Sequence, residues 1–431
     1  MKKVVWLMMS VLLAAGALAA DVTITTNGVN SFILGNAKGQ NLLCMSSNGR
    51  LYFGSQENYT NDSFFVLTSN DDGATWTNLT VNGFNSLFGA QTFNNQPTLQ
   101  IIGDTVYAMS SATSSGVRRI AKIAGTTNLS FSGSTYFDTL ALDKAGWADG
   151  RTVINFRNDS LIGFYDTTTN FAPFIGHGGR LANNGTTAWT LGALEALPNA
   201  TLYFPFAAKS VAAVWNHTAR DVYVSDGYDI DTASTDWPGA NIDGGPGYMS
   251  VVAASPTDSI VIGAFEIADS AIAIRGKLTH NGTNYVFTAI DTFVLVTLGK
   301  TARTENEQNS IFPSVTIMND SAYIAYQVMA DTTDTDTKTI CYRKFPIRGA
   351  AGTFTNSDED TLRVSTGADT LWSFAFPPYS YGGVLCGYFQ ATDNAGTSTT
   401  IKSITKVLDT GAPETGVGVT FRYGTTRESG R

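Results

Sequence analysis

The feature that most constrains the fold of this chain is a repeat of about fifty residues built from short strand-like runs. Seven such runs follow one another, with centres 55, 55, 50, 49, 62 and 61 residues apart. Most of them follow tight-turn residues, as at Asn48-Gly49 and Asn319-Asp320-Ser321, and such turns are typical of β-hairpins. A hairpin repeat of this length predicts a β-propeller. The centres are Tyr52, Tyr107, Ile162, Ala212, Val261, Tyr323 and Val384.

The repeat units can be filled out to four strands. In the first unit the predicted strands cover 41–45, 51–54, 64–68 and 76–79, and in the sixth they cover 313–318, 322–327, 339–344 and 353–355. We therefore predict an all-β fold, a seven-bladed propeller of four-stranded antiparallel blades, with six or eight blades as alternatives because the third strand near 171–175 is poorly marked. One of the segments 21–26 and 31–34 is expected to pair with the last blade. An aromatic residue is expected to open each fourth strand, at Trp76, Phe131, Trp189, Trp237, Tyr285, Phe354 and Phe421.

Composition agrees with an all-β chain and limits the partners. The chain has 42 Gly residues and only 15% charged residues, and Asn and Thr stand where helices favour Glu, Lys and Ala. Its formal net charge is −9, and removal of Lys2 and Lys3 gives −9 − 2 = −11. This charge argues against nucleic acid or anionic lipid as a partner. Cys44, Cys341 and Cys386 are expected to be core residues.

The first residues predict export. Lys2 and Lys3 precede an apolar run that ends in Ala17-Leu18-Ala19, the pattern of a secretory signal peptide. The run is too short to span a bilayer. We expect residues 1–19 to be removed and residues 20–431 to form a single domain in the periplasm, on the cell surface or outside the cell.

One motif resembles a known family. The segment from Ser69 to Trp76 reads Ser-Asn-Asp-Asp-Gly-Ala-Thr-Trp and matches the Asp-box pattern S-x-D-x-G-x-T-W at each defined position: Ser69, Asp71, Gly73, Thr75 and Trp76. The chain here resembles the sialidase-like, or BNR-repeat, propellers, and the resemblance implies a structural turn. Thr279-His280-Asn281-Gly282 is a degenerate echo of the motif.

The catalytic pattern of that family does not carry over to this sequence. The resemblance would imply an Arg-Ile-Pro motif, further arginines that hold a carboxylate, an acid/base Asp and a Tyr–Glu nucleophile pair. No Arg-Ile-Pro occurs, and Phe345-Pro346-Ile347-Arg348 is the reverse order.

The loops that join one blade to the next hold the candidates for ligand chemistry. Trp147 could stack on a sugar ring, and Arg151 and Arg303 could bind its polar groups. Paired carboxylates could instead supply the acid and base of glycoside hydrolysis, or they could be solvated loop charges. The candidate carboxylates are Asp149, Glu195, Glu305 and Glu307.

Two further loops carry residues that could bind an ion or supply histidine chemistry. Asp331, Asp334 and Asp336 lie in one predicted hairpin loop and could bind calcium, which takes roughly six to eight oxygen ligands, or form an exposed acidic tip. No cofactor is required by any motif. His177 lies in a glycine-rich stretch that predicts a flexible turn.

The sequence leaves two functions open. The first is a non-catalytic propeller that binds a glycan or a protein at its mouth, because only scaffold motifs are present. The second is a glycoside hydrolase or lyase that uses carboxylates from the loops between blades. The repeat does not distinguish them.

Overall fold

Every element that the structure, a computed structural model, describes is a β-strand. The described residues are the strands with some of their turns. They are 20–25, 42–56, 64–78, 98–102, 105–111, 117–125, 137–141, 152–157, 160–167, 175–183, 189–191, 195–196, 202–216, 221–226, 230–232, 249–267, 270–297, 313–329, 338–354, 359–364, 369–393 and 399–408.

The described strands form seven antiparallel sheets, which we name A to G. Sheet B contains β2 (Leu43–Met45), β3 (Leu51–Gln56), β4 (Phe64–Ser69) and β5 (Thr77–Asn78). Sheet C contains β6 (Thr98–Ile102), β7 (Thr105–Ser111), β8 (Val117–Gly125) and β9 (Phe137–Ala141). Sheet D contains β10 (Thr152–Arg157), β11 (Ser160–Thr167), β12 (Ile175–Asn183), β13 (Trp189–Leu191) and the extra strand β14 (Glu195–Ala196).

The remaining sheets follow the same order of pairing. Sheet E contains β15 (Leu202–Ala208), β16 (Val211–Asn216), β17 (Asp221–Ser225) and β18 (Ile230–Thr232). Sheet F contains β19 (Met249–Ala253), β20 (Ile260–Ile267), β21 (Ser270–His280) and β22 (Tyr285–Thr297). Sheet G contains β23 (Ser314–Met318), β24 (Ser321–Met329), β25 (Lys338–Pro346) and β26 (Asp360–Val364). Sheet A contains β27 (Asp369–Ala375), β28 (Val384–Asp393), β29 (Thr399–Val407) and β1 (Ala20–Thr25).

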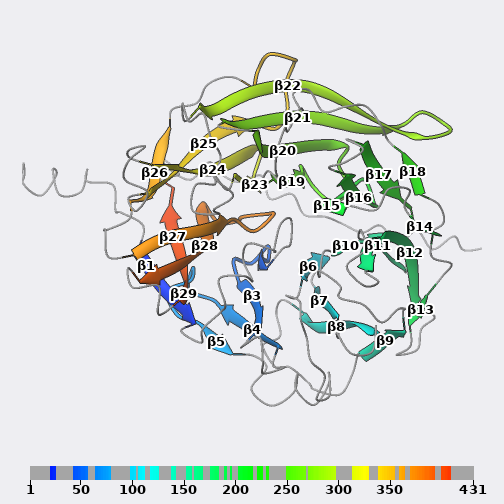
Figure 1. The fold of residues 1–431 in the computed structure, drawn as a ribbon, viewed down its shortest axis with the longest axis horizontal. Coiled ribbons are helices and arrows are strands. Elements are labelled where there is room, and N and C mark those ends of the chain that lie inside the picture. The colour runs from blue at the N-terminus through cyan, green and yellow to red at the C-terminus, as the bar shows by residue number, and fades with distance from the viewer. Residues whose placement is uncertain are drawn as a thin grey trace, which may run out of the picture.

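The sheets follow one another around a common centre, which gives a propeller-like architecture (Figure 1). Their hydrophobic core is divided into layers between neighbouring sheets. One layer packs sheet E on F, a second packs F on G, a third packs G on A and a fourth packs A on B. Small residues such as Ala264, Ala273 and Ala322 let the sheets in the second layer approach closely. Sheets F, G and A thus bury both faces against neighbouring sheets.

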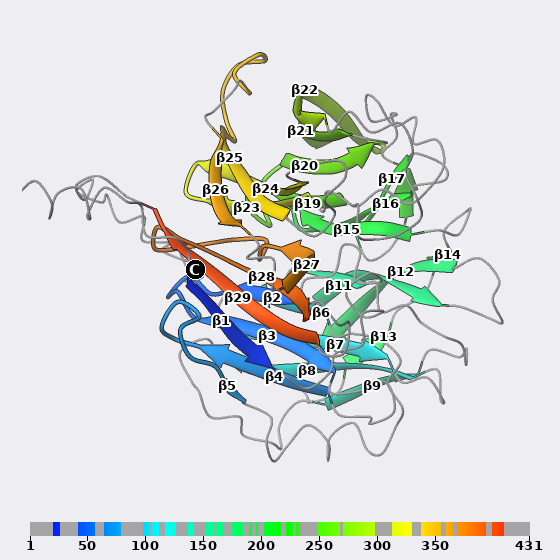
Figure 2. The same cartoon turned by 60° about the vertical axis from the view of Figure 1, so that its left-hand side comes forward.

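Strand β1 joins the two ends of the chain in one sheet. It pairs antiparallel with β29, from Ala20 opposite Thr405 to Thr25 opposite Ile401 (Figure 2). Ile24 is buried there beside Val384 and Ile401. The predicted pairing of segment 21–26 with the last unit is therefore confirmed.

The structure confirms the predicted strand at each repeat centre, because all seven centres lie in the second strand of their own sheet. The poorly marked third strand of sheet D is β12. Four predicted starts of fourth strands are wrong. In sheet C the fourth strand begins at Phe137 and in sheet E it begins at Ile230, whereas Phe131 and Trp237 lie outside the described residues. In sheet G the fourth strand begins at Asp360, and Phe354 lies in the turn before it. In sheet A the fourth strand is β1, and Phe421 lies outside the described residues.

Candidate functional site

The Ser69–Trp76 turn joins the third and fourth strands of sheet B through side-chain hydrogen bonds. The Asp71 carboxylate accepts hydrogen bonds from the Thr75 backbone N–H at 2.9 Å, the Thr75 hydroxyl at 2.6 Å and the Ser69 hydroxyl at 2.7 Å. The Gly73 N–H donates to the Ser69 hydroxyl. These bonds, those from Thr75 above all, hold the pKa of Asp71 below its ordinary value. The side chains predicted from the motif therefore build a turn.

The same turn is attached to the neighbouring sheet A. The Ser403 hydroxyl donates to the Gly73 carbonyl at 3.1 Å, and the Thr405 hydroxyl donates to the Asp72 carbonyl at 2.6 Å. The Trp76 indole N–H lies 3.1 Å from the Gly73 carbonyl and 3.2 Å from the Ser403 hydroxyl. The turn therefore fastens sheet B to the sheet that contains β1.

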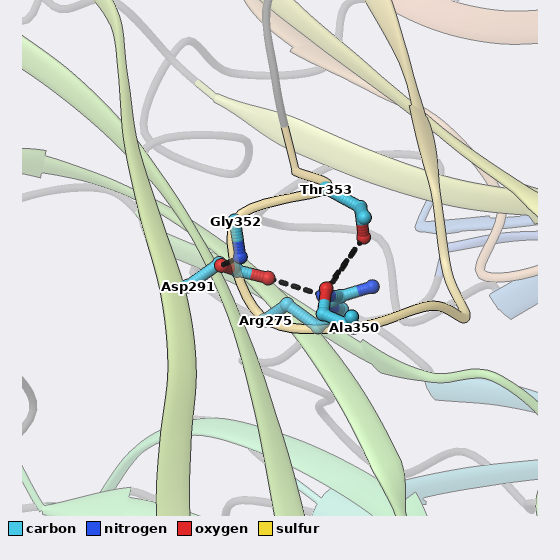
Figure 3. Close-up of polar contacts among 5 residues, drawn as sticks. All are labelled: Arg275, Asp291, Ala350, Gly352 and Thr353. Atoms are coloured by element: carbon cyan, nitrogen blue, oxygen red, sulfur yellow. Dashed lines mark hydrogen bonds and ion pairs between the residues drawn. The ribbon is translucent and has the colours of Figure 1, made fainter.

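A second turn of the same class fastens sheet G to sheet F by different chemistry (Figure 3). Arg275 of β21 lies directly opposite Asp291 of β22, and the two side chains form an ion pair. The Arg275 guanidinium also donates to the Ala350 carbonyl at 2.8 Å, and Asp291 accepts the Gly352 N–H. The Thr353 hydroxyl donates to the same Ala350 carbonyl at 2.7 Å. The turn 347–353 is thereby held by two charged side chains of the preceding sheet.

The Arg275 side chain is only 1% exposed, and Nε and Nη1 have no hydrogen-bond partner among the described residues. A buried guanidinium is costly unless a carboxylate neutralises it, so Asp291 is required for its burial. The site is therefore an ionic lock, in which an ion pair of sheet F holds a turn of sheet G.

A tyrosine–carboxylate pair lies at the same interface between sheets F and G. The Tyr326 hydroxyl donates to the Glu359 carboxylate and accepts a hydrogen bond from Arg343 Nε at 2.9 Å. Arg343 also lies 3.4 Å from Glu359. Burial, together with the hydrogen bond to Glu359, raises the pKa of Tyr326. The hydroxyl is thus kept protonated, which is the opposite of what an activated nucleophile needs.

A third charged cluster ties sheet G to sheet A. Lys406 of β29 lies 2.6 Å from the Asp360 carboxylate, which also accepts the Tyr342 hydroxyl at 2.7 Å. Burial acts against ionisation of Asp360, but the hydrogen bonds from Lys406 and Tyr342 prevail and hold its pKa below the ordinary value. This cluster also serves the contact between sheets.

The strand order determines where the loops of the predicted ligand site leave the sheets. In each antiparallel sheet the hairpin between the second and third strands lies at the same end as the connection to the next sheet. We call this end of the sheets the connection end. The opposite end holds the hairpins between the first and second strands and between the third and fourth strands, and we call it the turn end. The locks at 69–76 and 347–353 belong to turn-end hairpins.

Glu195 is the one predicted ligand-site residue in the described part of the chain. It lies in β14 opposite Gly178, near the start of β12 and hence at the connection end. The other candidates lie outside the described residues, in connections that leave from the same end: Trp147, Asp149, Arg151, Arg303, Glu305 and Glu307.

The position of His177 corrects the prediction of a flexible turn, whereas the calcium site in the acidic loop remains a prediction. His177 lies inside strand β12, opposite Tyr165 and Ala196, and so does not belong to a flexible turn. Asp331, Asp334 and Asp336 fall between β24 and β25, outside the described residues. Within the strands and turns that are described, no three His, Cys, Asp or Glu side chains are grouped to bind a metal.

The sequence did not indicate Arg275, Asp291 or Tyr326 as site residues. Arg275 and Asp291 each interrupt an apolar strand pattern, and a charge inside such a pattern indicates a buried pair. Their pairing required the register of β21 on β22, which two irregularities shift. No spacing in the sequence indicates that register.

Comparisons with known proteins find solved structures that are similar to this chain, but they do not assign it to a family. No family model and no curated protein matches the sequence. A protein of unknown function from Dyadobacter fermentans is 12% identical, with a TM-score of 0.43, and the match covers 91% of this chain and 100% of that one. A polysaccharide lyase of family PL25, an ulvan lyase bound to -[GlcA(1-4)Rha3S]-, is 10% identical, with a TM-score of 0.46 and coverage of 89% and 95%.

A subtype N11 neuraminidase-like protein of A/flat-faced bat/Peru/033/2010 (H18N11) is 13% identical, with a TM-score of 0.36, and the match covers 90% of this chain and 94% of that one. Similarity of this degree assigns neither a family nor an activity to the chain. No helix in the described part of the chain has the length and apolarity to cross a membrane.

Proposed function

We propose that the chain is a secreted, seven-bladed propeller, closed by β1, that binds a glycan at its connection end without transforming it. In this proposal each of the seven sheets is one blade, and the segment 1–19 is removed on export. The single observation that carries the proposal is the strand order. It brings every connection that holds a candidate ligand residue to one end of the sheets.

The residue types in those connections suit a sugar. An indole such as that of Trp147 can stack on the apolar face of a pyranose ring. Carboxylates and guanidinium groups, as in Asp149 and Arg151, can hydrogen-bond its hydroxyls. The net charge of −11 after removal of residues 1–19 favours a neutral or cationic glycan over an anionic one.

The tyrosine–carboxylate pair of Tyr326 and Glu359 is not arranged as a glycosidase nucleophile. Arg275, Arg343 and Lys406 each pair with a carboxylate at a contact between sheets, and the Tyr326 hydroxyl has a raised pKa. A tyrosine–carboxylate nucleophile of the kind that the sequence resemblance implies would need an exposed hydroxyl that ionises readily. Tyr326 is fully buried.

A glycan array tests the proposal with the purified chain from residue 20 onward, with and without calcium, followed by product analysis for every glycan bound. Binding with no product supports it. Turnover would overturn the non-catalytic part and direct mutagenesis to Asp149, Glu195, Glu305 and Glu307. Absence of binding to any glycan would overturn the proposed ligand and favour a protein partner.

Two arginine variants locate the site. Arg303→Ala removes a charge from a connection, whereas Arg348→Ala removes an exposed charge from the turn end. We expect weaker glycan binding for the first variant and unchanged binding for the second. An equal loss in both would contradict a site at the connection end.

A further inference from the structure

The hairpin turn between β21 and β22 lies at the turn end, and its residues are exposed. It consists of Asn281, Gly282, Thr283 and Asn284, and the Asn281 N–H donates to the Asn284 carbonyl at 3.0 Å. Gly282 has a φ of 104°, a conformation that few residues with a side chain adopt. The turn therefore holds an Asn–Gly pair in one defined geometry at the surface.

The side-chain amide of Asn281 is polarised by two backbone donors. Its Oδ1 accepts the Thr283 N–H at 2.9 Å and the Asn284 N–H at 2.8 Å. Two N–H groups on one carbonyl oxygen stabilise negative charge on that oxygen, as in an oxyanion hole. They also make the amide carbon, Cγ, a better target for a nucleophile.

The backbone nitrogen next to this amide is in contact with a base. The Gly282 N–H donates to Nδ1 of His280 at 3.2 Å, so this ring nitrogen is an acceptor and the neutral ring has its proton on Nε2. The His280 ring packs edge-on against Tyr285, directly opposite in the ladder, with centroids 4.9 Å apart. The contact orients the imidazole toward the Gly282 nitrogen.

We propose that His280 and the two N–H donors make Asn281 a site of self-catalysed deamidation. The Gly282 nitrogen attacks Cγ of Asn281, and its proton passes to Nδ1 of His280. A bond forms between the Gly282 nitrogen and Cγ, the bond from Cγ to Nδ2 breaks, and Nδ2 leaves as ammonia with the proton returned by the imidazolium. The product is a five-membered succinimide, and no oxidant or reductant takes part.

Water then opens the succinimide at one of its two carbonyl–nitrogen bonds. Cleavage at Cγ gives aspartate, and cleavage at the backbone carbonyl of residue 281 gives isoaspartate, with one extra methylene group in the chain. Either product adds a negative charge to the tip of the hairpin. Either product also removes the Asn281-Gly282-Thr283 sequon, the acceptor pattern for N-glycosylation.

A second Asn–Gly pair in the same chain provides the internal control. At Asn48-Gly49, in the turn between β2 and β3, the Gly49 N–H donates to the Ser46 backbone carbonyl at 2.8 Å. The carbonyl is a very weak base, so the Gly49 nitrogen has no imidazole to take its proton, although Oδ1 of Asn48 accepts the Arg50 N–H at 3.3 Å and the Ser46 hydroxyl. This turn thus differs from the Asn281 turn in the base that contacts the glycine nitrogen.

The experiment is peptide mapping by mass spectrometry of the folded full chain during incubation at neutral pH. Tryptic peptides with Asn281 and with Asn48 are compared for the amide-to-acid mass change and for isoaspartate. The variant His280→Phe keeps an aromatic ring against Tyr285 but removes the base. The same measurements in denaturant report the rates without the folded turn.

We expect Asn281 to deamidate at least about tenfold faster than Asn48 in the folded chain. A general base in an enclosed site typically accelerates a reaction by roughly 10²–10⁴-fold, and we expect a smaller acceleration here because the turn is exposed. In His280→Phe the rate at Asn281 should fall toward that at Asn48, and in denaturant the two sites should react alike. Equal rates in the folded chain, or an unchanged rate in a folded His280→Phe variant, would overturn the proposal.

Discussion

The carboxylate of Asp291 accepts a hydrogen bond from the backbone N–H of Gly352, which belongs to a turn of the neighbouring sheet. In sheet B, Asp71 accepts the backbone N–H of Thr75 from inside its own turn. Both turns join a third to a fourth strand, and both contact the preceding sheet. A carboxylate thus fixes each turn, in one case from within and in the other from the adjacent sheet.

Loss of the carboxylate between sheets should be costly. In Asp291→Ala, the buried Arg275 guanidinium loses its counter-ion, and removal of one partner of a buried pair typically costs about 3–5 kcal/mol. Guanidinium-induced unfolding of the variant and of the parent chain measures the difference in free energy. A change within about 1 kcal/mol, the value typical of an exposed pair, would contradict the lock.

A double variant tests the cause of that loss. Arg275→Met with Asp291→Leu removes both charges and keeps apolar volume, so it should recover most of the stability that Asp291→Ala loses. Arg348→Ala, in the exposed pair with Asp258, is the control and should change stability by less than about 1 kcal/mol.

The turn in sheet B should make stability depend on pH. Folding lowers the pKa of Asp71. The ionised carboxylate therefore stabilises the fold fully at pH values above the ordinary Asp pKa of about 3.9. This stabilisation is lost as the pH falls through the lower pKa of the folded state. Asp71→Asn should therefore be less stable than the parent at neutral pH, by about 1 kcal/mol because the group is partly exposed. The two proteins should converge in acid, which unfolding curves across the acidic range would reveal. A constant difference at all pH values would contradict this assignment.

Local patterns predicted the strands well because each depends on nearby residues. The second-strand runs around Tyr52 and Val261 are apolar and follow turn residues, and both lie where expected. Phe354 failed as the start of a fourth strand because its ring stacks on Phe345, with centroids 4.4 Å apart, inside the contact with sheet F. Packing between sheets thus overrode local propensity there.

The charged contacts between sheets could not be predicted in the same way. Arg275 and Ala350 meet only because two sheets lie side by side, and the sequence contains no signal for which turn contacts which strand. The sequence predicts the ligand candidates from their positions in loops between repeat units. The strand order agrees with a common location of these loops at the connection end, but it does not determine where the side chains lie. Among them the backbone of Glu195 alone can be located, in β14.

Gly276 should resist substitution because a side chain at this position has no space. A Cβ there would lie 2.1 Å from Cζ of Phe287, whose ring covers the glycine from the next strand. Gly276→Ala should therefore lower the free energy of unfolding by about 1–3 kcal/mol through overpacking. The double variant with Phe287→Leu should regain part of that loss relative to Phe287→Leu alone. Equal penalties in both backgrounds, measured by chemical denaturation, would show that the ring is not the cause.

The three cysteines should be unreactive in the folded chain and free after unfolding. Cys44, Cys341 and Cys386 are buried thiols without a disulfide. Burial raises the pKa of Cys341 and of Cys386 to about 12 and raises that of Cys44 as well. Since the thiolate is the reactive species, native protein should give almost no colour with Ellman's reagent at neutral pH, and denatured protein should give three equivalents.

The rate of thiol labelling then reports opening of the sheets. Cys44 lies between sheets B and C, where its thiol donates to the Leu99 carbonyl, and Cys386 lies behind the Ser69–Trp76 turn. Asp71→Asn should therefore accelerate labelling of Cys386 more than that of Cys44, which mass spectrometry of the labelled peptides distinguishes. Rapid labelling of any of the three in the native parent chain would contradict their burial, and equal acceleration at both sites would show that the turn does not protect sheet A locally.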